Sequence, residues 1–171
     1  VKEIDGEWLF GGKGLSADAA LKADVTTWSK VSIPHTWNAK DGEDGGGNYD
    51  RAAYWYHKEL SISQDMMGKS IYIEFTGANT QTTVYVNGKK AGDTHKGGYT
   101  AFRYDVTDLV KEGTNTLDVC VDNTYTQTIA PISGDFNMYG GIFRRVYLAA
   151  VDKVHVDLEK NGSSGLVLKT G

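Results

Sequence analysis

The sequence predicts an all-β protein, an antiparallel jelly-roll β-sandwich, and three observations support this fold class. Apolar and polar residues alternate with a period of two along most of the chain, as in strands with one buried face. The 171 residues include 21 glycines and 2 prolines, a balance that suits many tight turns between short strands. No long segment shows helical periodicity, so one short helix over 16–22 is all the helix that we expect.

We expect about eight or more short strands, and five alternating segments show the pattern in chain order. Their apolar residues are Tyr54, Tyr56, Leu60 and Ile62; Ile71, Ile73 and Phe75; Val84 and Val86; Leu117, Val119 and Val121; and Val154, Val156 and Leu158. Lys58 is out of step in the first segment, which makes that strand a looser match. The dipeptide Asn87-Gly88 follows the third segment and predicts a hairpin, because both positions tolerate a positive φ.

The composition excludes several classes of protein and site. A formal charge of −4 argues against nucleic acid or an anionic membrane surface as the main partner. No apolar run reaches the roughly 20 residues that span a bilayer. Cys120 is the single cysteine, so the fold must be stable without an intrachain disulfide. The four histidines are scattered, and no cluster has the spacing of a metal site.

Two features bear on domain organisation. The sequence from 41 to 49, "DGEDGGGNY", is a long loop between two aromatic-rich segments. The last residues resemble a connector followed by the first strand of another domain, so we expect a boundary near Lys160, with 1–160 as one domain and 161–171 as the connector. The start carries no signal-peptide pattern and leaves the compartment open, although a periplasmic or secreted location fits the chain.

Three stretches stand out from the scaffold. "SIPHTWNAKDG" contains Trp37 and Asn38, and its simplest interpretation is the end of an edge strand with a packed tryptophan. "HKGGYTAFRYDVTDLV" is interpreted as scaffold, with Asp and Thr side chains that cap a turn. "SGDFNMYGGIFRRVYL" places Asp135 in a turn-rich segment before Gly140 and Gly141, and a turn cap is the simplest role for that aspartate.

Taken in order, these stretches resemble one family. "VSIPHTWN", "AYWYHKEL", "SIYIEFTGANTQTTVYVNGKKAGDTHKGGYTAFRYDVTDLV", "NTLDVCVDN" and "GDFNMYGGIFRRVYL" are similar to the amino-terminal, sugar-binding domain of glycoside hydrolase family 2. The resemblance covers about residues 3 to 160 and is strongest to the bacterial β-galactosidases. It implies a jelly-roll β-sandwich. It also implies two partner domains in the same chain, an immunoglobulin-like domain and a (β/α)₈ barrel that holds the active site.

The resemblance assigns a role to Asp135. In the family's β-galactosidases, an aspartate seven residues before the "IFR" run binds hydroxyls of the galactosyl unit, and Asp135 stands seven residues before Ile142. A carboxylate suits this role because its oxygens accept charge-assisted hydrogen bonds from hydroxyls. In some members a cation lies beside this aspartate, which implies Mg²⁺ or Na⁺ in the complete enzyme. Asn48 and Arg51, in the other long loop, are further candidate sugar contacts.

The same resemblance limits what this chain can do. The catalytic acid/base and nucleophilic glutamates of the family belong to the barrel, and no residue here matches them. Retaining glycosidases need that pair roughly 5 Å apart. We therefore expect the domain to be the non-catalytic part of a retaining glycosidase, a β-galactosidase that acts on a β-galactoside or related glycan. The alternatives are the same domain of a β-glucuronidase or β-mannosidase, or a stand-alone carbohydrate-binding module.

Overall fold

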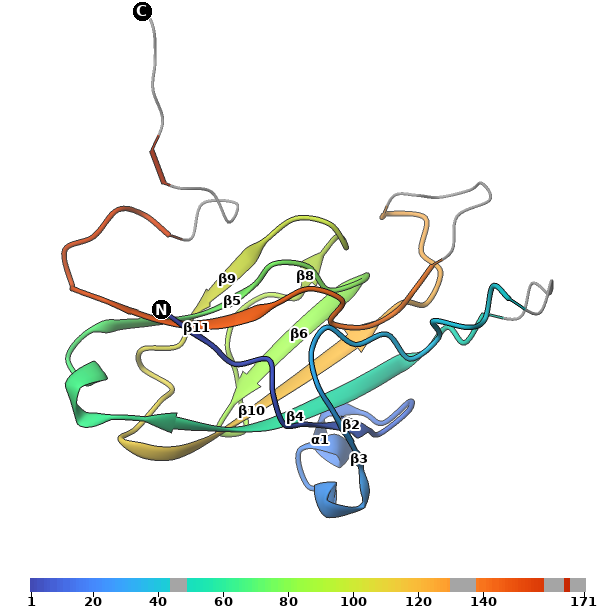
Figure 1. The fold of residues 1–171 in the computed structure, drawn as a ribbon, viewed down its shortest axis with the longest axis horizontal. Helices are drawn as coiled ribbons and strands as arrows, with labels where there is room; N and C mark the ends of the chain where they lie inside the picture. The colour runs from blue at the N-terminus through green and yellow to red at the C-terminus, as the bar shows by residue number, and fades with distance from the viewer. Residues whose placement is uncertain (44–48, 130–137, 159–164, 167–171) are drawn as a thin grey trace, which may run out of the picture.

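The computed structural model describes residues 1–43, 49–129, 138–158 and 165–166 (Figure 1). Its elements are β1 (Lys2–Glu3), β2 (Trp8–Gly11), α1 (Ala17–Ala20), the 3₁₀ helix η1 (Val25–Thr27), β3 (Ser29–Val31), β4 (Ala53–Ile62), the 3₁₀ helix η2 (Gln64–Met66), β5 (Ser70–Phe75), β6 (Gln81–Val86), β7 (Lys89–Lys90), β8 (His95–Lys96), β9 (Phe102–Asp105), β10 (Gly113–Asp122) and β11 (Val146–Val151). Strands dominate, so the all-β prediction is confirmed.

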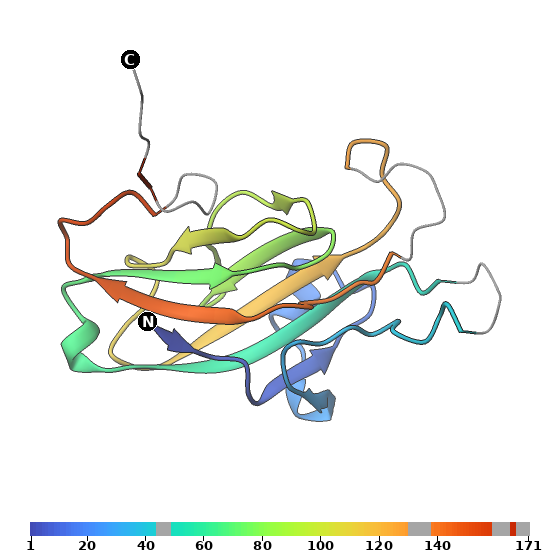
Figure 2. The same ribbon diagram turned by 45° about the horizontal axis from the view of Figure 1, so that its top comes forward.

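The strands form two sheets that lie one over the other (Figures 1 and 2). One sheet has the strand order β1-β11-β5-β9, and the other has the order β3-β2-β4-β10-β6-β7, with β8 also paired to β6. All strand pairs among the described residues are antiparallel. The long strands β4 and β10 pair along their whole lengths, from Ala53 opposite Asp122 to Ile62 opposite Gly113. This pair fixes where the connecting loops leave the sandwich.

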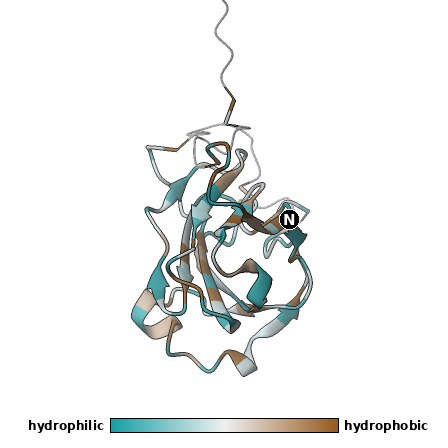
Figure 3. Ribbon diagram, turned by 90° about the vertical axis from the view of Figure 1, so that its left-hand side faces the viewer, coloured by the Kyte–Doolittle hydropathy of each residue, from teal (hydrophilic) through white to brown (hydrophobic). Residues whose placement is uncertain are grey.

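The core fills the space between the two sheets, and the predicted apolar positions supply much of it. Hydrophobic and hydrophilic residues alternate along the strands (Figure 3). The alternating residues of β5, β6 and β10 are all buried: Ile71, Ile73, Phe75, Val84, Val86, Leu117, Val119 and Val121. Burying a side chain of this size contributes about 1.5–3 kcal/mol. The alternation in the sequence therefore identified the faces of these three strands correctly.

Lys58, which is out of step in β4, has a local explanation. Its side chain is half-buried on the same face as Tyr56 and Leu60, and its amine donates hydrogen bonds to the carbonyls of Gly6 and Glu7. Burial lowers the pKa of this amine below its usual value. The lysine thus caps the turn before β2 and does not interrupt the strand.

The predicted short helix and hairpin are both present. α1 begins after Ser16, whose hydroxyl accepts a hydrogen bond from the Ala19 amide, and it is shorter than the expected range. Asn87 and Gly88 have φ values of 50° and 76° and join β6 to β7. Among the described residues, no helix has the length and apolar character needed to cross a membrane.

The prediction of a strand over 154–158 is wrong, because the last strand of the described residues is β11. Val154 is 94% exposed, so its alternation with His155 does not reflect a buried face. Side chains of the neighbouring sheet hold this segment instead: the Tyr72 hydroxyl lies 3.0 Å from His155 Nε2, and Arg103 donates to the Leu158 carbonyl at 2.9 Å. The expected boundary near Lys160 lies outside the described residues and stays a prediction.

Candidate functional site

Two long connections leave the sandwich at the same end. β4 begins at Ala53 and β10 ends at Asp122, and these two residues are directly paired. The connection that enters β4 and the one that leaves β10 therefore start side by side, as Figures 1 and 2 show. We call this region the loop end and define it by its described residues 35–43, 49–52, 123–129 and 138–143. All three predicted sugar contacts belong to these two connections.

The main chain at Met138 is held by two buried asparagines. Asn38 Nδ2 donates to the Met138 carbonyl at 3.1 Å, and Asn123 Nδ2 donates to the same oxygen at 2.9 Å. A carbonyl oxygen has two lone pairs, so both are used here. Asn38 Oδ1 also accepts from the Gly140 amide at 2.8 Å. The main chain of residues 138–140 is thus fixed by two side chains.

A third buried asparagine holds the next residues. Asn79 Nδ2 donates to the Tyr139 carbonyl at 2.7 Å, and the backbone of Asn79 exchanges hydrogen bonds with Gly141 at 3.0 and 3.3 Å. The Asn79 Oδ1 atom accepts from the Thr80 hydroxyl at 2.8 Å. Residues 138–141 therefore receive hydrogen bonds from three asparagines that come from different parts of the sequence.

Two glycines are required for this close approach. A Cβ atom on Gly140 would lie 2.0 Å from Cζ2 of Trp37, well inside contact distance. Gly141 has a φ of 137°, and a Cβ there would lie 2.3 Å from the His35 carbonyl oxygen. The absence of a side chain at both positions therefore lets residues 140–141 pack directly against residues 35–37.

Asp50 joins the loop before β4 to the same region. Its carbonyl accepts from Trp37 Nε1 at 3.0 Å and from Asn123 Nδ2 at 3.4 Å. Its carboxylate accepts from the Tyr54 hydroxyl at 2.6 Å and pairs with Lys13 at 2.7 Å. Burial pulls the pKa of Asp50 upward, but the hydrogen bonds from Lys13 and Tyr54 outweigh it and hold that pKa below its usual value. Asp50 is therefore a charged structural anchor.

An aromatic cluster lies beneath these anchors. Phe10 packs against the rings of its neighbours at centroid distances of 4.6–6.0 Å; these are His35, Trp37, Tyr54 and Tyr56. His35 Nδ1 lies 2.8 Å from the Tyr56 hydroxyl, and burial lowers the pKa of the His35 imidazole. The loop end thus rests on a rigid apolar support, and the packed tryptophan predicted at Trp37 is confirmed. The expected edge-strand end also fits, because the edge strand β3 ends at Val31, directly before this stretch, and residues 33–43 contain no strand.

Of the three predicted sugar contacts, one lies among the described residues and two do not. Asp135 and Asn48 lie outside the described residues. Arg51 is exposed, and its guanidinium carbon lies 5.9 Å from the centroid of the Tyr49 ring. Within the described parts of the chain, no three His, Cys, Asp or Glu residues gather in a group able to hold a metal ion. The cation expected beside Asp135 is untested by this, since Asp135 is not among those residues.

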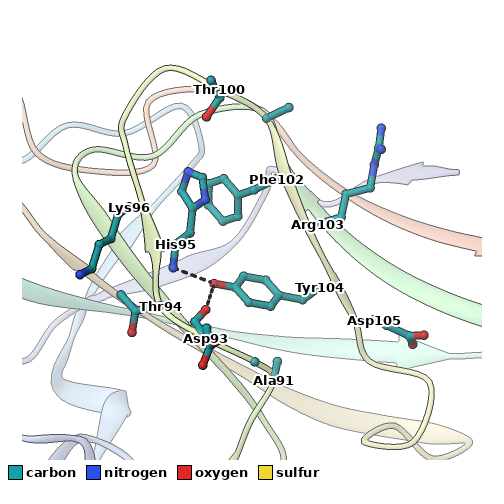
Figure 4. Close-up of a pocket in the computed structure, with 12 residues that line it drawn as sticks. Ala91, Asp93, Thr94, His95, Lys96, Thr100, Phe102, Arg103, Tyr104 and Asp105 are labelled. Atoms are coloured by element: carbon teal, nitrogen blue, oxygen red, sulfur yellow. Dashed lines mark hydrogen bonds between the residues drawn. The ribbon is translucent and has the colours of Figure 1, made fainter. Parts of the chain in front are cut away.

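One hollow in the described part of the chain is separate from these contacts. It lies between β8 and β9, has a volume of about 950 Å³, and contains none of the predicted site residues (Figure 4). Its central Tyr104 hydroxyl accepts from the His95 amide at 3.2 Å and lies 2.8 Å from the Asp93 carbonyl, so it is occupied within the fold. The side chain of His95 stacks on Phe102 at a centroid distance of 3.8 Å. In this hollow, Tyr104 and His95 thus serve the packing of the sheet edge.

Sequence reasoning singled out Asn38 but missed Asn79 and Asn123. Each follows a segment of strand-like alternation or precedes one, and both are buried. Asparagine is rarely buried without a structural role. However, only the tertiary contacts show that they converge on residues 138–141.

Comparisons with known proteins agree with this picture. Residues 1–151 match the family model described as "Glycosyl hydrolases family 2, sugar binding domain". A putative β-glucuronidase of Formosa agariphila is 39% identical over 156 residues, covering 91% of this chain and 19% of that protein. A β-galactosidase of Thermoanaerobacter pseudethanolicus is 32% identical over 160 residues, covering 91% and 21%.

A solved structure gives the same result. The crystal structure of a Bacteroides uniformis β-glucuronidase superposes with a TM-score of 0.86 at 39% identity and covers 95% of this chain and 19% of that one. The chain thus spans about a fifth of the length of the relatives that it matches. On its sequence and its fold alike, this chain belongs to glycoside hydrolase family 2, as the sugar-binding domain of that family.

Proposed function

We propose that this chain is the non-catalytic amino-terminal domain of a retaining β-glycosidase and contributes one loop to the binding of the terminal glycosyl unit. The observation that carries the proposal is the fixed main chain at Met138, three residues after Asp135. A side chain that binds sugar hydroxyls must be held in place by a rigid support. The immunoglobulin-like domain and the catalytic barrel, with its two glutamates, are proposed parts of the complete enzyme.

Asp135 is the proposed ligand of the sugar hydroxyls. An ionised carboxylate accepts short hydrogen bonds from two neighbouring hydroxyls, and such charge-assisted bonds contribute about 1.5–3 kcal/mol each. If the contact strengthens as the sugar ring distorts, its loss lowers kcat as well as apparent affinity. Asn48 and Arg51 are proposed as additional contacts from the neighbouring connection, and a bound Mg²⁺ or Na⁺ beside Asp135 stays part of the proposal.

The substitution Asp135→Asn in the complete enzyme tests this role. We expect a fall in kcat/KM of about a hundredfold, equivalent to about 2.7 kcal/mol, with an unchanged melting temperature. Asp105→Asn is the matched control, because Asp105 Oδ1 caps a turn by accepting from the Thr107 amide at 2.9 Å. The control is expected to lower stability and leave kinetics unchanged. If Asp135→Asn behaves like the control, Asp135 is a turn cap and the proposal is wrong.

Two substrate classes are proposed for the complete enzyme. A β-galactoside is favoured by the resemblance of the "GDFNMYGGIFR" stretch, and a β-glucuronide is favoured by the higher identity to the F. agariphila relative. Comparing kcat/KM for nitrophenyl β-galactoside and nitrophenyl β-glucuronide on the complete enzyme separates them. If the complete enzyme prefers a β-mannoside to both, then a β-mannoside is its substrate class and both proposals are wrong.

A further inference from the structure

Four asparagines are buried among the described residues, and three of them share one target. Asn38, Asn79, Asn115 and Asn123 are 1%, 3%, 1% and 0% exposed. Asn38, Asn79 and Asn123 all donate to the main chain of residues 138–139. We call these three the asparagine cradle. Asn115 lies near the start of β10, at the opposite end of the sandwich from Asn123.

Packing of the core alone does not require the asparagine cradle. A buried amide costs free energy unless its donors and acceptor find partners, so a core is cheaper to build from apolar side chains. At this end, however, three separate segments offer amides to a single short stretch of backbone. Asn38 comes from the connection before β4, Asn79 from the turn before β6, and Asn123 from the end of β10. The hydrogen bonds therefore tie this stretch to three separate segments of the chain.

Asn123 also couples the two connections to each other. Its Oδ1 accepts from the Ala52 amide at 2.9 Å, while its Nδ2 donates to the carbonyls of Met138 and Asp50. One side chain thus holds the main chain on both sides: at 50–52, next to the candidate contact Arg51, and at Met138, three residues after Asp135. A shift of either connection strains the other through this amide.

We propose that Asn38, Asn79 and Asn123 are positioning residues of the glycosidase, and that Asn123 is the residue that couples the two loops. The inference rests on the proposed function, since it supplies the support on which the sugar-binding loop depends. These side chains touch no substrate themselves. They act by holding residues 138–141 and 50–52 in the geometry that presents both loops to the sugar.

The substitution Asn123→Asp is the sharpest test because it keeps shape and volume. Its carboxylate still accepts from the Ala52 amide, but it cannot donate to the carbonyls of Met138 and Asp50. Asn38→Asp is a second variant of the same kind, which keeps the bond to the Gly140 amide and loses the donor to Met138. The second variant keeps the proposal testable if the first fails to fold.

Asn115→Asp is the matched control, because Asn115 lies near the start of β10 and Asn123 directly follows its end. Asn115 Oδ1 accepts from Asn87 Nδ2 and from the Lys111 amide, both at 2.8 Å, and its Nδ2 donates to the carbonyls of Lys111 and Gly113. The control therefore loses two donors from an equally buried amide. Its partners are turn residues that lie away from both long loops.

Each variant is made in the complete enzyme, and melting temperature, kcat and KM are measured on the β-glycoside that the enzyme turns over. We expect all three to lower the melting temperature. We expect Asn123→Asp and Asn38→Asp to lower kcat/KM at least tenfold, partly through kcat, and Asn115→Asp to change it less than twofold. A loss of activity that follows the melting temperature alone, equal in the control, would overturn the positioning role.

Asp135→Asn in the same series separates the two proposals. If Asp135→Asn is kinetically silent, the proposed function fails and the cradle has no loop to position. If Asp135→Asn is strongly impaired while Asn123→Asp matches Asn115→Asp, the positioning role alone is wrong.

Discussion

A buried asparagine lies at each end of β10, but the two asparagines have different kinds of hydrogen-bond partner. At one end, Asn115 bonds to residues of neighbouring turns, within 87–113. We call this the hairpin end and define it by residues 86–91 and 109–116. At the other end, Asn123 bonds to Asp50, Ala52 and Met138. A buried asparagine therefore closes a turn at the hairpin end and joins two long connections at the loop end.

If the proposed function holds, this difference separates contacts that stabilise the sandwich from contacts that support a sugar-binding loop. The hairpin end is self-contained: Asn87 Nδ2 donates to the Leu109 carbonyl at 2.8 Å, and Asn87 Oδ1 accepts from the Thr116 amide at 3.0 Å. At the loop end, the same kind of asparagine hydrogen bond joins segments that are far apart in the sequence. A site carried by loops needs such rigid anchors beneath it.

The largest expected effect on stability is that of a glycine substitution at the loop end, compared with one at the hairpin end. Gly141→Ala should cost about 4 kcal/mol of unfolding free energy, because the backbone is strained and the new Cβ meets the His35 carbonyl. Gly88→Ala should cost about 1 kcal/mol, because Gly88 has a positive φ but no atom within 4 Å of the new Cβ. Urea denaturation of this domain measures both. Equal losses would contradict the close packing described for the loop end.

The next largest loss of unfolding free energy comes from removing a buried asparagine side chain, and it should be equal at the two ends. Asn123→Ala and Asn115→Ala each leave buried partners without a hydrogen bond, so each should cost about 2 kcal/mol in the same urea experiment. Equal stability losses make the comparison of their kinetics in the complete enzyme meaningful. A difference between them larger than about 2 kcal/mol would show that the two amides are not matched.

A smaller effect is expected from Trp37→Phe. This variant removes the donor to the Asp50 carbonyl and should cost about 1 kcal/mol locally. The connection before β4 contains the exposed residues Lys40 and Arg51, where trypsin cleaves. Cleavage there should become about fivefold faster, because local opening becomes more frequent. Cleavage at Lys111, at the hairpin end, is the internal control and should not change; an equal increase at both would refute a local role.

The smallest effect concerns acid pH. The pKa of Asp50 is held below its usual 3.8, so its contacts with Lys13 and Tyr54 stabilise the fold above that pH and are lost as pH falls through the folded value. The stability advantage of the native chain over Asp50→Asn should therefore shrink between about pH 5 and pH 3, by about 0.5 kcal/mol. Unfolding free energies of both proteins across this range measure it. An advantage that grows on acidification would contradict the sign.

The hairpin end was largely predictable from the sequence, whereas the loop end was not. Asn87-Gly88 and the alternation in β6 and β10 are local signals, and the structure confirms them. The same signal failed at 154–158, because alternation does not show whether a neighbouring strand is available for pairing. The asparagine cradle depends on contacts across the whole chain, such as Asn38 with Met138. No short-range pattern encodes such a contact, so Asn79 and Asn123 were missed.

Hydrogen exchange of the complete enzyme tests the proposal that the loop end holds the sugar and the hairpin end does not. The probe is a non-hydrolysable thioglycoside of the preferred sugar, present at saturation or absent. We expect slower exchange in peptides from 38–43, 49–52 and 138–143, including the Gly140 amide bonded to Asn38. We expect unchanged exchange at 86–91 and 109–116. Protection that is absent at the loop end, or equal at both ends, would contradict the proposal.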